Sequence, residues 1–227
     1  PAPYWWAIFY AIFVGINIAG VELTFRITVA ITLLALAVLI VFWIGALPLF
    51  RWEHALDVVP DPGASVWFPK GLAGISASLP FAIWFFLAIE QLPLAAEESH
   101  DPKRDMPRGL LWGLATLIIA AFFTLFLNAG IGPGSTIVGA SEEPLFLAFR
   151  TLFGEGTGST LLALAAVAGL VASFHAIIYA YGRNIFSLAR AGYFPTWMSR
   201  THPTRNTPYV ALVVGAVSGY AVALAIE

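Results

Sequence analysis

Cysteine is absent from this 227-residue sequence, which excludes a disulfide framework and any site built on thiolate ligands. Charged residues are scarce at 11%, whereas a soluble domain carries about 25%. Hydrophobic residues make up 59%, so polar side chains are too few to cover a water-soluble globule. The formal net charge of -2 comes with no dense basic patch, and we therefore expect no nucleic acid partner.

Six long apolar stretches take up most of the chain, and each is close to the length of about 20 residues that a helix needs to cross a bilayer. The first has no basic region before it and no small-residue cleavage site after it, so it is not a signal peptide. The sequence therefore predicts an all-α, polytopic membrane helix bundle that forms a single transmembrane domain over residues 1–227. Because the sequence opens at Pro1 and closes inside an apolar stretch, we expect a fragment of a longer protein. The predicted spans are residues 4–23, 27–49, 75–95, 109–128, 159–182 and 209–226.

The connections between the spans differ in charge. Eight of the 11 lysines and arginines follow the first, third and fifth spans, and by the positive-inside rule these connections face the cytoplasm. The connections after the second and fourth spans are expected outside, and a short amphipathic helix is predicted over residues 142–153. The connecting segments are residues 21–26, 51–74, 96–108, 129–158 and 183–208.

Glu90 is an acidic residue well inside the third apolar stretch. A carboxylate at this depth is costly unless it is paired, solvated or protonated, so Glu90 suits a proton carrier or the counter-ion of a cationic substrate. The alternative is a protonated or paired glutamate that only ties two helices together. Pro80 and Pro93 bracket the segment, which indicates either a broken helix that can grip a ligand or a simple kink. Trp84 can cap an ammonium group through cation–π attraction, or it faces lipid.

The fifth stretch contains a second group of polar residues, Ser173 and His175. An intramembrane histidine can relay protons, and the alternative is a neutral histidine that is hydrogen-bonded between helices. Asn17 in the first stretch is expected to make a hydrogen bond between helices. No phosphate-binding loop, nucleophile elbow or zinc-protease motif is present, so we expect neither an enzyme nor a bound cofactor or metal ion.

Three motifs carry a resemblance to a known family. Residues 95–109, AAEESHDPKRDMPRG, resemble the cytoplasmic signature that follows the sixth transmembrane helix in the amino acid–polyamine–organocation (APC) transporter superfamily. Residues 181–195, YGRNIFSLARAGYFP, followed by Thr207 and Pro208, resemble the connection between helices eight and nine. Residues 17–21, NIAGV, resemble the end of helix four. The matches stand in the family's order and cover most of the chain.

The resemblance implies that the six spans are helices four to nine of a twelve-helix transporter with a LeuT-like fold, which contains inverted five-helix repeats. In that fold, helices one and six are unwound at the middle of the membrane and hold the substrate. On this register Trp84 is the gating aromatic residue, and residues 85–90 form the unwound stretch. The substrate-binding residues that the resemblance implies are Trp84, Phe85, Leu87, Ala88, Glu90, Ser173 and His175, with Glu90 and His175 as candidates for proton coupling.

The coupling ion and the substrate follow less directly from the resemblance. Many relatives carry a lysine on helix five, but Ile31 stands at about that position, so the coupling ion is either a proton or sodium. Residues 169–184 look most like the bacterial ethanolamine permeases. We therefore expect a secondary transporter that moves a small amine, ethanolamine, across the bacterial cytoplasmic membrane by alternating access. The alternatives are an amino acid or polyamine permease of the same superfamily and a membrane sensor that binds substrate without moving it.

Overall fold

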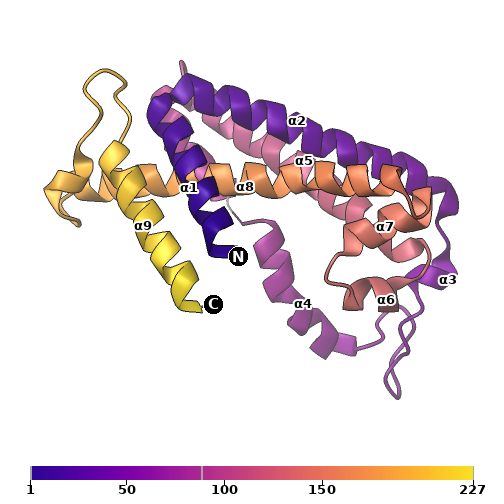
Figure 1. Cartoon of the computed structure of the whole chain (residues 1–227). Helices are drawn as coiled ribbons and strands as arrows, with labels where there is room; N and C mark the ends of the chain where they lie inside the picture. The colour runs from indigo at the N-terminus through magenta and orange to yellow at the C-terminus, as the bar shows by residue number, and fades with distance from the viewer. Residues whose placement is uncertain (1, 88, 227) are drawn as a thin grey trace. The chain divides into compact units, whose positions relative to one another are not determined.

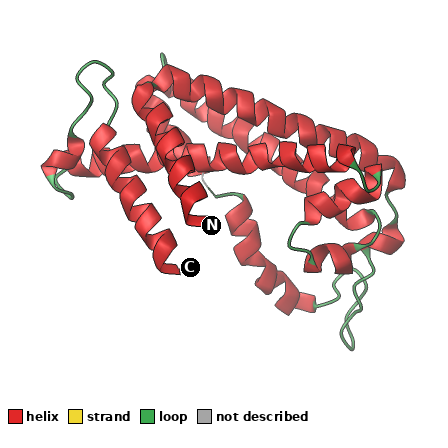
Figure 2. Cartoon of the chain, viewed as in Figure 1, coloured by secondary structure: helices red, strands yellow, loops and turns green. Residues whose placement is uncertain are grey.

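The computed structural model describes residues 2–87 and 89–226, and throughout these ranges every regular element is a helix (Figure 2). This confirms the predicted all-α class. In chain order the elements are α1 (Ala2–Ala19), α2 (Val21–Ala46), the 3₁₀ helix η1 (Leu47–Leu49), α3 (Trp52–Ala55), α4 (Gly71–Phe85), the 3₁₀ helix η2 (Ile89–Glu98), α5 (Pro102–Gly130), α6 (Ser135–Ala140), α7 (Pro144–Phe153), α8 (Thr157–Arg190), the 3₁₀ helix η3 (Thr196–Ser199) and α9 (Tyr209–Ile226).

Six helical segments in the described part of the chain are long and apolar enough to cross a membrane, and they confirm the predicted polytopic helix bundle. Most of their large apolar side chains are exposed, as expected for helices that face lipid or further helices. The predicted amphipathic helix over residues 142–153 is present as α7. The six segments are Ala2–Ala19, Val21–Leu49, Gly71–Ala96, Pro102–Gly130, Thr157–Arg190 and Tyr209–Ile226.

The elbow between the first two spans differs from the prediction. A turn was expected over residues 21–26, but α2 already begins at Val21 and only Gly20 separates it from α1. Gly20 has a φ of 151°, in a region that side-chain-bearing residues rarely adopt, so one residue reverses the chain. The Gly20 carbonyl accepts hydrogen bonds from the Thr24 N–H at 3.1 Å and from the Thr24 hydroxyl at 3.0 Å, which tie Gly20 to the first turn of α2.

Two helices extend beyond the predicted spans into the charged connections. Helix α5 begins at Pro102 rather than at residue 109, and α8 continues to Arg190 rather than ending at 182. Proline is favourable in the first helical turn, where its missing N–H is not needed. Hydropathy locates the apolar part of a helix, whereas the polar ends outside the hydrocarbon continue with the same backbone geometry.

The chain divides into two compact units, Ala35–Val167 and the pair of segments Pro1–Leu34 and Ala168–Glu227. The sequence predicts that residues 1–227 form a single transmembrane domain. This stays a prediction. In the first unit, Phe42 of α2, Leu127 of α5 and Phe149 of α7 form part of a buried apolar core. The Trp43 indole N–H donates to the Thr124 hydroxyl at 3.1 Å, which links α2 to α5.

The other unit is built from α1, the N-terminal part of α2, the C-terminal part of α8, η3 and α9, and α1 and α9 run side by side in it (Figure 1). Its core contains Phe13, Val14, Ile178 and Leu212. The Tyr181 hydroxyl donates to the Leu212 carbonyl at 3.1 Å. Close packing of this kind lets long apolar helices associate without a large hydrophobic driving force.

The connections after α2 and α5 are tied together by Asp57, which lies outside the membrane-spanning segments. Its carboxylate accepts hydrogen bonds from the Ser135 hydroxyl at 2.6 Å and from the Thr136 N–H at 2.9 Å. Partial burial acts to raise the pKa of the Asp57 carboxyl, but the hydrogen bonds from Ser135 and Thr136 outweigh it and lower that pKa. Gly134 has a φ of 106°, and a Cβ atom there would collide with this carboxylate.

Candidate substrate site

The third span is interrupted rather than only kinked, which decides between the two alternatives that Pro80 and Pro93 left open. Helix α4 ends at Phe85, the chain turns at Phe86 and Leu87, and the 3₁₀ helix η2 begins at Ile89. The Leu87 N–H donates to the Trp84 carbonyl at 3.2 Å, a tightened bond that is typical of a helix end. Pro93 cannot donate the hydrogen bond to the Ile89 carbonyl that a continuous α-helix requires.

Four of the predicted site residues lie at this interruption. Trp84 stands in the last turn of α4 with 74% of its surface exposed, and Phe85 and Leu87 are also exposed. Glu90 lies in the first turn of η2 with an exposed side chain. Among the described residues, the Glu90 carboxylate makes no hydrogen bond and no ion pair. Ala88 lies outside the described residues. The binding roles of all five stay predictions.

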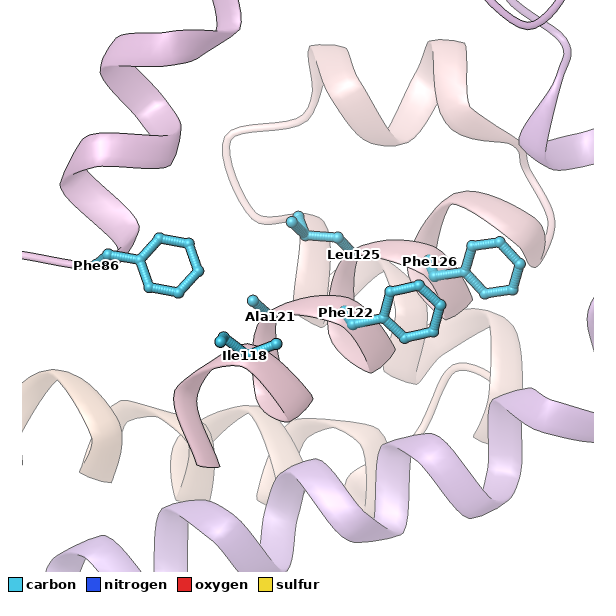
Figure 3. Close-up of a pocket in the computed structure, with 6 residues that line it drawn as sticks. All are labelled: Phe86, Ile118, Ala121, Phe122, Leu125 and Phe126. Carbon is cyan, nitrogen blue, oxygen red and sulfur yellow. The ribbon is translucent and has the colours of Figure 1, made fainter. Parts of the chain in front are cut away.

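An apolar hollow of about 500 Å³ lies beside the interruption, between the turn after α4 and the middle of α5 (Figure 3). Phe86 points toward α5 from the turn, and Phe122 and Phe126 stack with ring centroids 5.3 Å apart. Every lining side chain is apolar, so the hollow offers hydrophobic contact and no partner for a charge. Sequence reasoning missed this hollow, although the spacing of Phe122 and Phe126 placed both rings on one helix face. The lining residues are Phe86, Ile118, Ala121, Phe122, Leu125 and Phe126.

The two predicted site residues on α8 have different surroundings. The His175 side chain is completely buried. Its Nδ1 atom lies 3.3 Å from Asn17 Nδ2, and its Nε2 atom lies 3.4 Å from the Thr24 carbonyl oxygen. Asn17 therefore makes the hydrogen bond between helices that the sequence predicts. Ser173, two residues earlier on α8, is exposed. The substrate-binding role of Ser173 and His175, and the coupling role of Glu90 and His175, stay predictions.

The helical architecture with six apolar segments, one of them interrupted, is that of an integral, multi-pass membrane protein. The family model "Amino acid permease" matches residues 1–227. The chain belongs to this family, and the predicted membership of the APC superfamily is confirmed. The names of the family and of the relatives below denote permeases and transporters rather than enzymes.

Three relatives illustrate the range of the family. An uncharacterised transporter of Rhizobium meliloti (strain 1021) is 36% identical over 208 residues, which are 87% of this chain and 42% of the relative. The branched-chain amino acid permease BcaP of Bacillus subtilis (strain 168) is 26% identical over 63% of this chain and 30% of its own length. The methylthioribose transporter of the same organism is 23% identical over 88% of this chain and 42% of its own length. The chain thus spans less than half the length of these relatives.

Proposed function

We propose that the full-length protein is a secondary transporter that moves a small amine, ethanolamine, across the bacterial cytoplasmic membrane by alternating access in a LeuT-like fold. The observation that carries the proposal is the Glu90 carboxylate. It lies in an interrupted membrane span, with no hydrogen-bond or ion-pair partner among the described residues. A carboxylate in a span is costly unless it is paired, solvated or protonated. A cationic substrate supplies the missing partner.

Ethanolamine matches this site because it has an ammonium group and no carboxylate. Its ammonium is expected to bind Glu90 and backbone carbonyls over residues 84–87, where the helix interruption bends the chain. Trp84 closes over the ammonium through cation–π attraction, since its ring is exposed at the end of α4. Phe85 and Leu87 form the apolar border of the site, and Ala88 is a further binding residue that the family resemblance implies. Ser173, exposed on α8, is a further substrate-binding residue that the family resemblance implies.

The coupling ion is a proton or sodium. Glu90 suits proton coupling because a carboxylate inside a span can bind either a proton or the substrate ammonium, but not both at once. Substrate binding then displaces the proton. The lysine that serves many relatives on helix five has no counterpart at Ile31.

An amino acid permease is the second candidate, and the name of one relative, a branched-chain amino acid permease, favours it. The name of another relative, a methylthioribose transporter, indicates that family membership alone does not set the substrate. A neutral amino acid would bring its own carboxylate, which Glu90 repels unless other residues separate the two groups. A membrane sensor that binds ethanolamine without moving it is a third reading.

Uptake of radiolabelled ethanolamine by the full-length protein in reconstituted vesicles tests the proposal. We expect saturable uptake that unlabelled ethanolamine suppresses and neutral amino acids leave largely unchanged. Uptake of branched-chain amino acids in place of ethanolamine would overturn the substrate assignment. Saturable binding without accumulation inside the vesicles would instead identify a sensor.

A further inference from the structure

Helix α8 presents its two predicted site residues to opposite sides. Successive residues of an α-helix are about 100° apart around its axis, so Ser173 and His175 are separated by about 200°. The structure agrees, because Ser173 is exposed while His175 is buried against α1 and the start of α2. One of these two side chains is therefore open to a ligand, and the other is enclosed by the protein.

The hydrogen bonds around His175 define which ring nitrogen carries a proton. The Phe13 carbonyl accepts a hydrogen bond from Asn17 Nδ2 at 2.8 Å, so the amide NH₂ group is oriented by a group that can only accept. The same NH₂ group faces His175 Nδ1, which therefore accepts. The Thr24 carbonyl also can only accept, so His175 Nε2 donates to it. This arrangement fits a neutral imidazole with its proton on Nε2.

A second proton on His175 has no acceptor in this arrangement, since it would point from Nδ1 at the donor group of Asn17. Tyrosines are the titratable side chains of α1 and α9. On α2, Glu22 and Arg26 pair with each other at 2.6 Å and are exposed. On α8, the Arg183 guanidinium lies 3.5 Å from the centre of the Tyr179 ring. Among the described residues, no carboxylate is hydrogen-bonded to His175.

Two threonine side chains also donate hydrogen bonds to backbone carbonyls of the elbow between α1 and α2. The Thr207 hydroxyl donates to the Ile18 carbonyl at 3.0 Å, and the Thr24 hydroxyl donates to the Gly20 carbonyl. Thr24 and Thr207 are both buried. His175 thus belongs to a set of side chains that contact backbone carbonyls around the point where α1 ends and α2 begins.

We propose that His175 is a positioning residue: together with Asn17 and the Thr24 carbonyl, its neutral imidazole holds α8 in one rotation against the α1–α2 elbow and keeps Ser173 on the exposed face of α8. This role rests on the transport function proposed above, because substrate is expected to meet the face of α8 that carries Ser173. It assigns no proton transfer to His175.

The first test compares His175→Gln with His175→Ala in the full-length protein. A glutamine amide can still donate to the Thr24 carbonyl, so we expect His175→Gln to keep ethanolamine uptake and its pH profile. His175→Ala loses both bonds, and we expect a fall of about three- to tenfold in uptake with the shape of the pH profile unchanged. Leu164→Ala, at an exposed position of α8 on the side opposite to Ser173, is the matched control. If His175→Gln abolishes gradient-driven accumulation but keeps substrate exchange, His175 carries the coupled proton and the proposal is overturned.

The second test measures the rotation of α8 directly and does not depend on transport. The 227 residues contain no cysteine, so Ser173→Cys introduces a single thiol here, in a background in which cysteines elsewhere in the protein are replaced by serine. We expect His175→Ala to change the rate at which a small charged thiol reagent modifies this cysteine, and Leu164→Ala and His175→Gln to leave it unchanged. An unchanged rate in His175→Ala overturns the proposal.

A thermal-unfolding cycle in detergent separates failure of this proposal from failure of the proposed transport. Because Asn17 and His175 share one hydrogen bond, Asn17→Ala combined with His175→Ala is expected to lower the unfolding temperature less than the sum of the single variants. Additive shifts would overturn the proposal even if ethanolamine is transported. Non-additive shifts support it even if the substrate proves to be another compound.

Discussion

Glu90 and His175 are both polar, ionisable residues within apolar spans, but they occupy different kinds of helix. Glu90 follows an interruption between α4 and η2, and its exposed side chain makes no hydrogen bond or ion pair among the described residues. His175 lies in the middle of the uninterrupted helix α8, and both of its ring nitrogens face groups of α1 and α2. Each residue belongs to a different compact unit of the chain.

The contrast between the surroundings of Glu90 and those of His175 indicates what makes an intramembrane polar residue available to a ligand. In a continuous helix that is packed on its neighbours, the neighbours use the hydrogen-bonding capacity of the side chain. Where the helix is interrupted, the packing is open and a carboxylate stays without a protein partner. On this account Glu90 acts on the substrate, whereas His175 acts on the structure. Substitutions at the first residue change affinity, and substitutions around the second change stability.

The largest effect is expected for Glu90→Gln, which removes the charge but keeps the size of the side chain. An ammonium that loses its carboxylate partner in a desolvated site costs about 2–5 kcal/mol, so uptake of ethanolamine falls by about thirtyfold or more. The measurement is initial-rate uptake in vesicles that contain equal amounts of each protein. Glu90→Asp keeps the charge and is expected to retain part of the uptake. Normal uptake by Glu90→Gln would remove Glu90 from the mechanism.

Trp84→Ala tests whether the region around Glu90 acts on substrate affinity rather than on stability. The exposed ring is proposed to cover the ammonium, and a cation–π contact contributes about 0.5–2 kcal/mol. We therefore expect the KM for ethanolamine to rise by about tenfold, with the unfolding temperature unchanged. Trp84→Phe keeps an aromatic face and should show a smaller rise. A loss of stability without a change in KM would indicate that Trp84 is a packing residue.

Thr207→Val tests whether the hydrogen bonds around the α1–α2 elbow act on stability rather than on substrate affinity. Valine matches the size of threonine but cannot donate to the Ile18 carbonyl, and an unpaired buried carbonyl costs about 1 kcal/mol. Thermal unfolding in detergent should show this loss, while the KM for ethanolamine stays the same. Thr207→Ser, which keeps the hydroxyl, is the control. A changed KM with unchanged stability would break the division between the two regions.

The smallest effect is expected at Asp57, away from both residues. Its pKa is lowered in the folded protein because the bonds from Ser135 and Thr136 outweigh burial. Its stabilising contribution is therefore complete above the unfolded pKa of about 3.9 and is lost as the pH falls through the lower folded value. Asp57→Asn should lower the free energy of unfolding by about 1 kcal/mol at neutral pH. The stability of this variant should also lack the part of the pH dependence that Asp57 contributes in acid. Equal acid sensitivity of both proteins would contradict the assignment.

The class of fold could be predicted from the sequence because a membrane span leaves a strong signal in the length of its apolar stretches. Pro93 also marked the interrupted span, since proline removes a backbone hydrogen bond, whereas α4 continues through Pro80. The position of the elbow could not be predicted in the same way. Glu22 and Arg26 interrupt the hydropathy after Gly20 and led to a predicted turn over residues 21–26, whereas the observed turn depends on the φ angle of Gly20.

The surroundings of the candidate site residues were harder to predict. The sequence left two roles open for His175, because hydropathy does not say which face of α8 meets α1. The apolar hollow beside Phe86 depends on how α5 packs, which composition does not encode. The hydrogen bond that Asn17 makes between helices was predicted correctly, although its partner, His175, could not be named from the position of Asn17 in the chain.

Equilibrium binding of radiolabelled ethanolamine to the purified full-length protein compares the two residues most directly, when Glu90→Gln and His175→Gln are measured side by side. The account predicts that Glu90→Gln loses detectable binding, while His175→Gln binds within about threefold of the unsubstituted protein, since it keeps one of two interhelical bonds. Retained binding in Glu90→Gln together with lost binding in His175→Gln would contradict the account.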